Sequence, residues 1–251
     1  MIRAVLIDLG DTLVHLARPW DDVFRDNLES LYAYLRGEGL NSAFDEFAKI
    51  FIRGFESAST VSHFYKIEIP LQDIVSKTLR KSKFRQPDLA FVDSAVIEFY
   101  KPEIDAWELY PDTVETLSAL HDSGFDLGLI SNSKSDWAVR AILDKHGLRR
   151  FFKVIVTSAA LRKRKPRPDP FAEALSGLGV KPSEAVFVGD SLQADILGAR
   201  TFGIRSIHVL RKPIEHPLLV VPEATVNSLS EALEQITRWN SASSGMISSA
   251  G

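Results

Sequence analysis

The sequence predicts an α/β protein whose doubly wound parallel sheet carries an inserted block of helices. Two observations favour this fold class. From about residue 108 onward, short apolar runs rich in β-branched residues alternate with helical patterns. A long stretch of helical periodicity, residues 15–105, separates these runs from a first apolar run at 4–8. A chain of 251 residues has room for one large domain or two smaller ones.

The expected strands are nearly continuous in apolar character, which favours strands covered on both faces in a parallel sheet. They cover residues 4–8, 126–130, 153–157, 185–189 and 204–209, with a weaker one near 224–228. Between them, helices are expected over residues 111–123, 135–146, 170–178 and 192–202. Ser135 is the expected N-cap of the second of these helices, and Gly147 follows its end.

Residues 15–105 carry apolar side chains at spacings of three and four, as on one face of a helix. Four such faces are expected, and the first begins with Trp20, which is assigned to their shared core. These residues predict a helical cap, 15–105, with hinges near 14–19 and 103–110. The sheet domain then comprises residues 1–14 and 106–240, and the small polar stretch 241–251 is expected to be a disordered tail.

Composition excludes several classes of function. The net charge of −3 gives no bulk reason to expect nucleic-acid or membrane partners, and the absence of cysteine rules out thiol catalysis and disulfides. No apolar run approaches the ~20 residues that span a bilayer, and no secretory signal is expected. A cytoplasmic protein is therefore predicted. The basic run 162–167 could serve as a nucleic-acid patch, but such a run is typical of a solvated loop.

Residues suited to catalysis follow four of the expected strands. In chain order they are Asp8 with Thr12, Ser131 with Asn132, Lys165, and Asp190 with Asp195. Because the ends of parallel strands meet along one edge of a sheet, we expect these side chains to converge there. Three crowded carboxylates need a cation, and hard oxygen ligands suit Mg²⁺. Lys165 can supply a positive charge to a bound anion, and Ser131 can bind phosphate oxygens.

With these motifs the chain resembles the haloacid dehalogenase superfamily with a helical, C1-type cap. The resemblance covers most of residues 1–210. It is carried, in the family's order, by LIDLGDTL, by ISNS, by KPRP with the following Phe171, and by GDSLQADILGA. One such motif is weak support, whereas four in order at strand ends are strong support. The resemblance implies a Rossmann-like core and a hydrolase.

The resemblance also implies roles for the residues at the end of the first strand. Asp8 would be the nucleophile that attacks phosphorus and forms an aspartyl-phosphate, which water then hydrolyses. Mg²⁺ would be held by Asp8, by the backbone carbonyl of Gly10 and by Asp190. Thr12 and Ser131 would hold phosphate oxygens. The implied activity is a Mg²⁺-dependent phosphatase acting on a small phosphorylated metabolite.

The remaining motif residues receive supporting roles from the same resemblance. Asn132 would line the substrate site. Lys165 would pair with both Asp8 and the phosphate, which favours the ionised carboxylate and stabilises charge in the transition state. Asp195 would position Lys165 or a metal-bound water. Neither the substrate nor the oligomeric state follows from the sequence.

The sequence departs from the family's pattern at Gly10, where its phosphatases usually carry an aspartate that transfers protons. General acid–base catalysis contributes roughly 10²–10⁴-fold. The backbone carbonyl of Gly10 is retained, so the metal site is kept while the proton-transfer group is absent. Asp11 lies one residue further on and is expected to point elsewhere. Activity should therefore favour good leaving groups, such as acyl or aryl phosphates.

Two alternative functions stay open. One is hydrolytic dehalogenation of a 2-haloacid, a branch of the family that needs no metal, and the acidic pair Asp190 and Asp195 argues against it. The other is a weakly active or inactive protein that acts by binding, which Gly10 keeps in consideration. Chloride release without metal would favour the first alternative, and no turnover on a broad panel of phosphates would favour the second.

Overall fold

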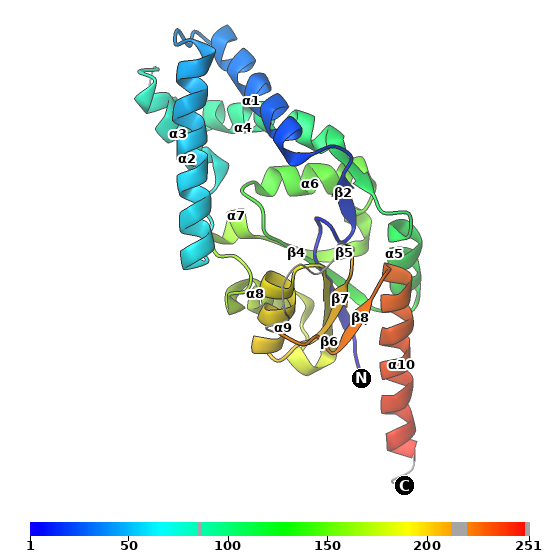
Figure 1. Ribbon diagram of the computed structural model, residues 1–251. Coiled ribbons are helices and arrows are strands. Elements are labelled where there is room, and N and C mark those ends of the chain that lie inside the picture. Colours follow the sequence, from blue (N-terminus) through cyan, green and yellow to red (C-terminus); the bar gives the residue numbers. More distant parts are fainter. Residues whose placement is uncertain (85–86, 212–219, 249–251) are drawn as a thin grey trace.

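The structure, a computed structural model, describes residues 1–84, 87–211 and 220–248. Its central feature is a six-stranded sheet in the order β5-β4-β1-β6-β7-β8, in which every neighbouring pair is parallel (Figure 1). The strands are β1 (Ala4–Ile7), β4 (Asp126–Ser131), β5 (Phe152–Thr157), β6 (Ala185–Gly189), β7 (Arg205–Val209) and β8 (Ala224–Val226). The predicted parallel α/β sheet is confirmed, including its weak last strand.

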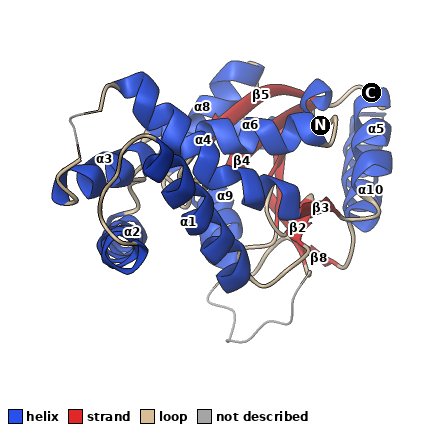
Figure 2. Ribbon diagram, turned by 90° about the horizontal axis from the view of Figure 1, so that it is seen from above, coloured by secondary structure: helices blue, strands red, loops and turns tan. Residues whose placement is uncertain are grey.

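The two faces of the sheet are covered by different helices. Val5 and Ile7 of β1 face one apolar core, whereas Ala4 and Leu6 face the other. The first face is covered by α5 (Thr113–Asp122), α6 (Asp136–Lys145) and α10 (Leu229–Ser248), and the second by α8 (Pro168–Leu178) and α9 (Leu197–Thr201). Figure 2 shows α5 and α10 side by side. Burial on both faces explains why the strands read as continuous apolar runs.

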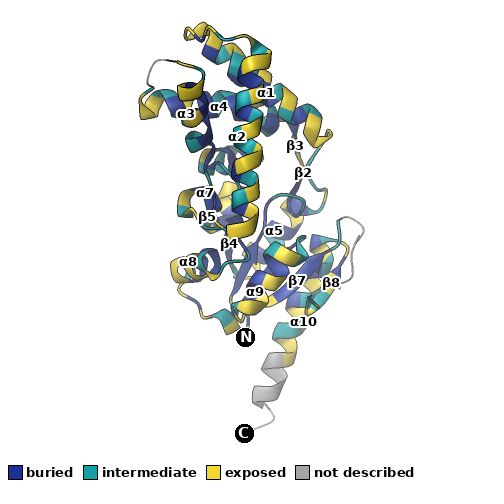
Figure 3. Ribbon diagram, turned by 60° about the vertical axis from the view of Figure 1, so that its left-hand side comes forward, coloured by how far each residue is buried: buried dark blue, intermediate teal, exposed yellow. Residues whose placement is uncertain are grey.

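Four helices, inserted between β1 and the rest of the sheet, form a separate layer above it. They are α1 (Trp20–Gly37), α2 (Phe44–Tyr65), α3 (Leu71–Lys81) and α4 (Leu89–Ala106). Their inward faces share their own apolar core, in which Phe47, Phe51 and Phe99 are fully buried. Figure 3 shows the exposed outer faces of these helices. We propose that residues 15–105 form a cap domain on a core of residues 1–14 and 106–240.

Both connections to the cap pass through a small antiparallel ribbon that the sequence did not predict. Strand β2 (Val14–Leu16) pairs with β3 (Trp107–Leu109), with His15 opposite Glu108. Strands of three residues are too short to show a reliable period, so the pattern gave no signal. The ribbon coincides with the two expected hinge segments and joins them to each other.

Other differences concern local structure. The prediction that Trp20 belongs to the core of the helices is wrong, because the residue is 44% exposed at the start of α1. The helix expected at 192–202 begins with a π-helical turn, Leu192–Ile196, before α9. Short helical elements also occur at Arg149–Phe151, Ser158–Leu161 (α7) and Pro182–Glu184. Within the described residues, none of the helices combines the length and apolar character needed to cross a membrane.

The expected disordered tail also differs from the structure. Helix α10 continues to Ser248, so residues 241–248 are helical, while 249–251 lie outside the described residues. The first part of α10 is anchored by Leu229, Ala232 and Ile236 in the core. Once a helix is nucleated, each further residue adds a hydrogen bond, so small polar residues can extend it.

Candidate active site

The predicted site residues meet at the carboxyl edge of the sheet. Strand β1 lies between β4 and β6, so Asp8, which follows β1, lies between the ends of its two neighbours. The amide of Asp8 donates a hydrogen bond to the carbonyl of Val188 at 3.0 Å. Ser131 is the last residue of β4, and Asp190 follows β6. All three line a cavity of about 1180 Å³ between the sheet and the cap helices.

Lys165 lies at the centre of the acidic residues. Its Nζ is 2.6 Å from Asp8 Oδ1 and 2.7 Å from Asp195 Oδ1, and it also donates to the carbonyl of Ile130 at 2.7 Å. The side chain is only 1% exposed. Burial opposes its charge, but Asp195 and then Asp8 outweigh that effect and raise the pKa of Lys165. The structure thus contains the expected pairing of Lys165 with Asp8.

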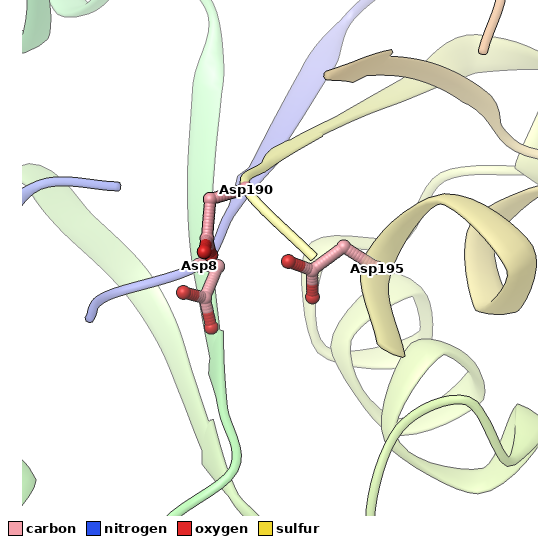
Figure 4. A group of neighbouring side chains, drawn as sticks. All are labelled: Asp8, Asp190 and Asp195. Carbon is pink, nitrogen blue, oxygen red and sulfur yellow. The ribbon is translucent and has the colours of Figure 1, made fainter. Parts of the chain in front are cut away.

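Three carboxylates converge at this edge. Asp8, Asp190 and Asp195 each place one oxygen within 4.8 Å of the others, and Figure 4 shows the three side chains grouped together. Burial raises the pKa of Asp8 to about 6, since desolvation outweighs the opposing effect of Lys165. Burial, then Asp8 and Asp195, raise the pKa of Asp190 to about 8. One lysine does not neutralise three buried acids, so the donor set fits a divalent cation.

The position of Asp195 depends on a glycine at the end of β6. Asp195 Oδ2 accepts a hydrogen bond from the amide of Ser191 at 3.0 Å, which folds the side chain back against the strand. A Cβ on Gly189 would lie 2.4 Å from the same oxygen. Asp195 thus packs directly on the backbone of Gly189 and turns its other oxygen to Lys165. We propose that Asp195 positions Lys165.

Thr12 and Asn132 both hydrogen-bond to other residues of the site. Thr12 is fully buried, and its hydroxyl lies 3.4 Å from both Asp8 Oδ2 and Asp190 Oδ1. We propose that it orients these carboxylates rather than contacting phosphate. Asn132 lines the cavity, and its side chain bonds to the backbone of Lys165. Asn132 Nδ2 donates to the carbonyl of Lys165 at 3.1 Å, and the backbone N–H of Lys165 donates to Asn132 Oδ1 at 2.9 Å. We propose that Asn132 holds the backbone of Lys165, with Ser131 left to bind substrate.

Asp11 lies in the turn after β1. Its backbone is left-handed, with φ 54°, a conformation that aspartate adopts more readily than most residues. Asp11 lines the cavity beside Asp8 and Gly10, and its charge contributes to the raised pKa of Asp190. Asp11 therefore contributes to the wall of the cavity that Asp8 also lines. The left-handed residue turns the chain so that residues 8, 10 and 11 all reach the cavity.

Trp107 occupies the space above Gly10. A Cβ on Gly10 would lie 3.4 Å from Cη2 of the indole, which is ordinary van der Waals contact. The indole Nε1 lies 3.4 Å from Oε1 of Glu103, a buried residue of α4. Burial raises the pKa of Glu103 to about 7. Trp107, at the start of β3, thus covers the turn that contains Gly10.

Sequence reasoning assigned no individual role to several charged residues that line the cavity. They include Glu68 and Glu103 of the cap, and Lys134 and Arg164 of the core. Glu103 follows Phe99 by four residues on the buried face of α4, so a charge interrupting an apolar face was a usable signal. The other three give no such signal, because their juxtaposition arises only when the cap docks on the core.

Comparisons with known proteins agree with this geometry. A family model described as haloacid dehalogenase-like hydrolase matches residues 2–203. The match covers well over half of the chain, so the protein belongs to this family and is a hydrolase. The sheet order and the inserted helices fit the Rossmann-like core and helical cap expected from the sequence.

Individual relatives carry different printed activities. The chain is 29% identical over 223 residues to the glyceraldehyde 3-phosphate phosphatase of Methanopyrus kandleri, covering 84% of this chain and 85% of that protein. It is 30% identical over 210 residues to the pyrophosphatase PpaX of Bacillus pumilus, covering 83% of each. The crystal structure of a 2-haloacid dehalogenase from Pseudomonas syringae matches with a TM-score of 0.68 at 25% identity, covering 95% of this chain and 100% of that one.

Proposed function

We propose that the protein is a Mg²⁺-dependent phosphatase that hydrolyses a small phosphorylated metabolite through an aspartyl-phosphate on Asp8. The observation that carries this proposal is the arrangement at the sheet edge, where Lys165 bridges Asp8 and Asp195 while Asp190 faces Asp8. The relatives named as phosphatases and a pyrophosphatase support phosphoryl chemistry. The cavity beside the site has room for a leaving group as well as the phosphate.

Asp8, the backbone carbonyl of Gly10 and Asp190 would hold the metal. Bound there, Mg²⁺ would neutralise phosphate charge and favour ionised carboxylates. Lys165 and Thr12 each touch one oxygen of Asp8, so the carboxylate is held in a fixed orientation. Ser131 would hold a phosphate oxygen. In the first step Asp8 attacks phosphorus and the bond to the leaving oxygen breaks. Water then attacks the phosphorus, which releases phosphate and restores Asp8.

The site lacks a side chain at position 10 that could transfer a proton to the leaving group. An alkoxide leaving group needs a proton, and Gly10 supplies none. Asp11 lines the same cavity and is the candidate to supply it. Good leaving groups such as aryl or acyl phosphates need little protonation, so we propose that they are the better substrates.

The experiment measures aryl-phosphate hydrolysis by the purified protein with and without Mg²⁺, beside an Asp8→Asn variant. We expect metal-dependent turnover that the variant loses. Chloride release from a 2-haloacid without metal would instead favour a dehalogenase, the activity printed for the Pseudomonas syringae structure. No turnover on a panel of phosphorylated metabolites, with the fold intact, would favour a binding protein.

A further inference from the structure

Two positively charged side chains, those of Lys134 and Arg164, line the cavity beside the proposed phosphate site. Lys134 comes two residues after Asn132, and Arg164 directly precedes Lys165. Both side chains line the cavity, and they are 12% and 27% exposed. They are therefore carried by the same two loops that carry proposed phosphate-site residues, on the side of the cavity that faces the cap.

A buried carboxylate from the cap holds both cations. Glu68, which is 1% exposed, has its Oε1 3.3 Å from Lys134 Nζ and its Oε2 3.3 Å from an Arg164 guanidinium nitrogen. Ser158 also donates to Glu68 Oε2, at 2.8 Å. The cap segment is tied in place by its backbone, because Glu68 N donates to Arg162 O at 3.1 Å and Arg164 N donates to Lys66 O at 3.2 Å. The cations are thus pre-positioned.

The cluster has an excess of positive charge and of hydrogen-bond donors. Two cations face one carboxylate, so its net charge is about +1. Within the described part of the chain, Glu68 is the hydrogen-bonding or ion-pair partner found for the side chains of Lys134 and Arg164. Together these groups have eight N–H donors. Their 3.3 Å distances also exceed the 2.7–2.9 Å usual for charge-assisted hydrogen bonds. Because both side chains line the cavity, we infer that their remaining N–H donors are available to an anion there.

We propose that Lys134 and Arg164 form a second anion subsite, which binds a carboxylate or phosphate on the leaving group of a phosphate monoester. The inference rests on the proposed function, because it assumes that the Asp8 site takes the phosphoryl group. The substrate class is then a phosphate ester with a second anionic group, held between the sheet edge and the cap. Glu68 acts as a positioning residue that sets the spacing of the two cations.

Three probes compare a second anion with none. Glycerol 3-phosphate has no second anion, 3-phosphoglycerate replaces its terminal alcohol with a carboxylate, and pyrophosphate supplies a phosphate instead. Hydrogen bonds to charged groups are worth a factor of roughly 10–100 in binding. We expect kcat/KM to be at least about tenfold higher for one of the two probes with a second anionic group than for glycerol 3-phosphate. The preferred probe identifies which anion the subsite takes.

Charge-removing variants locate the preference. Lys134→Gln and Arg164→Gln should each lower kcat/KM for the preferred probe about tenfold through KM, with a much smaller change for glycerol 3-phosphate. Lys163→Gln is the matched control, because Lys163 lies in the same basic run but pairs with Asp169 and is absent from the cavity wall. Glu68→Gln should keep the preference. The subsite would be overturned if Lys134→Gln and Arg164→Gln lowered kcat/KM equally for all probes. It would also be overturned if Glu68→Gln lost the preference while Lys134→Gln and Arg164→Gln kept it.

Binding separates failure of this inference from failure of the proposed function. Calorimetry with the Asp8→Asn variant measures affinity for 3-phosphoglycerate, pyrophosphate and glycerol 3-phosphate without turnover. Tighter binding of 3-phosphoglycerate or pyrophosphate than of glycerol 3-phosphate, with the difference lost in Asp8→Asn/Arg164→Gln, supports the subsite. This holds even if the wild-type protein hydrolyses none of the three probes. Equal affinity for all three probes overturns the subsite, even if the wild-type protein is an active phosphatase.

Discussion

Replacing Gly10 with aspartate should add a proton-transfer group to a site that otherwise retains its proposed metal ligands and Lys165. The backbone of Gly10 lies outside the left-handed region, so a side chain there adds no backbone strain. The new Cβ would meet Trp107 Cη2 at 3.4 Å, a contact that needs no rearrangement. The carboxylate beyond it must pass the indole, which is held by a long 3.4 Å hydrogen bond to Glu103 and can therefore shift.

The expected gain depends on the leaving group. General acid–base catalysis contributes roughly 10²–10⁴-fold, and crowding by Trp107 places this variant near the lower limit. We predict that Gly10→Asp raises kcat/KM for glycerol 3-phosphate about 10²-fold, and for p-nitrophenyl phosphate less than about threefold. Combining it with Trp107→Phe, which shortens the ring above position 10, should increase the gain on the alkyl substrate.

Steady-state kinetics with both substrates at saturating Mg²⁺ test this reasoning. Gly10→Ala is the control, because it adds the Cβ without the carboxylate and should give no gain. Equal gains on the two substrates, or no gain on either, would refute the proposed role of position 10. Asp11→Asn completes the comparison. If Asp11 already donates the proton, this variant slows alkyl-phosphate hydrolysis selectively and Gly10→Asp adds little.

Three further variants probe the surroundings of the site. Lys165→Met should abolish turnover and lower the free energy of unfolding by about 3–5 kcal/mol, because Asp8 and Asp195 lose the cation between them. In the same urea titration, Lys163→Met, at a partly exposed ion pair, should cost under about 1 kcal/mol, and equal costs would contradict the buried pairing. Gly189→Ala should displace Asp195 and lower kcat about 10²-fold with the fold retained by circular dichroism; unchanged kcat would show that the packing is not needed. The pKa of Glu103 is about 7 in the folded protein against an ordinary 4.5, so between those pH values only the folded carboxyl keeps its proton. The free energy of unfolding should therefore fall, by up to about 3 kcal/mol, as the pH rises through this window, and Glu103→Gln should flatten that slope in urea unfolding from pH 5 to 8.

The sheet and the main site residues were predictable because their signals are local. A strand buried on both faces reads as an apolar run, and residues after such runs must share one edge of a parallel sheet. Asp8 and Asp190, which directly follow β1 and β6, are placed at this edge by the rule, whereas Lys165 lies beyond α7 and was identified through its motif. The proposed roles of Thr12 and Asn132 do not follow from the sequence, because a hydroxyl or amide at a strand end can face either the ligand or its neighbours. Their partners are visible only in three dimensions.

The remaining features that the sequence did not predict depend on contacts or backbone conformations that no local pattern encodes. Glu68 meets Lys134 across 66 residues of chain, and no local period encodes that contact. The ribbon of β2 and β3 joins strands of three residues whose pairing depends on where the cap begins and ends. Asp11 reaches the cavity through a left-handed backbone, which its residue type permits but does not require.

The most direct test of the central claim is to trap the phosphoryl group on Asp8 during turnover. An aryl phosphate needs little acid assistance in the first step, whereas Gly10 provides no base to activate water in the second. Phosphorylated Asp8 should therefore accumulate in the steady state and be found by mass spectrometry of acid-quenched protein. We predict a phosphorylated peptide containing Asp8 that requires Mg²⁺ and is absent from Asp8→Asn. Turnover that persists in Asp8→Asn, or a phosphoryl group found on another residue, would contradict the account.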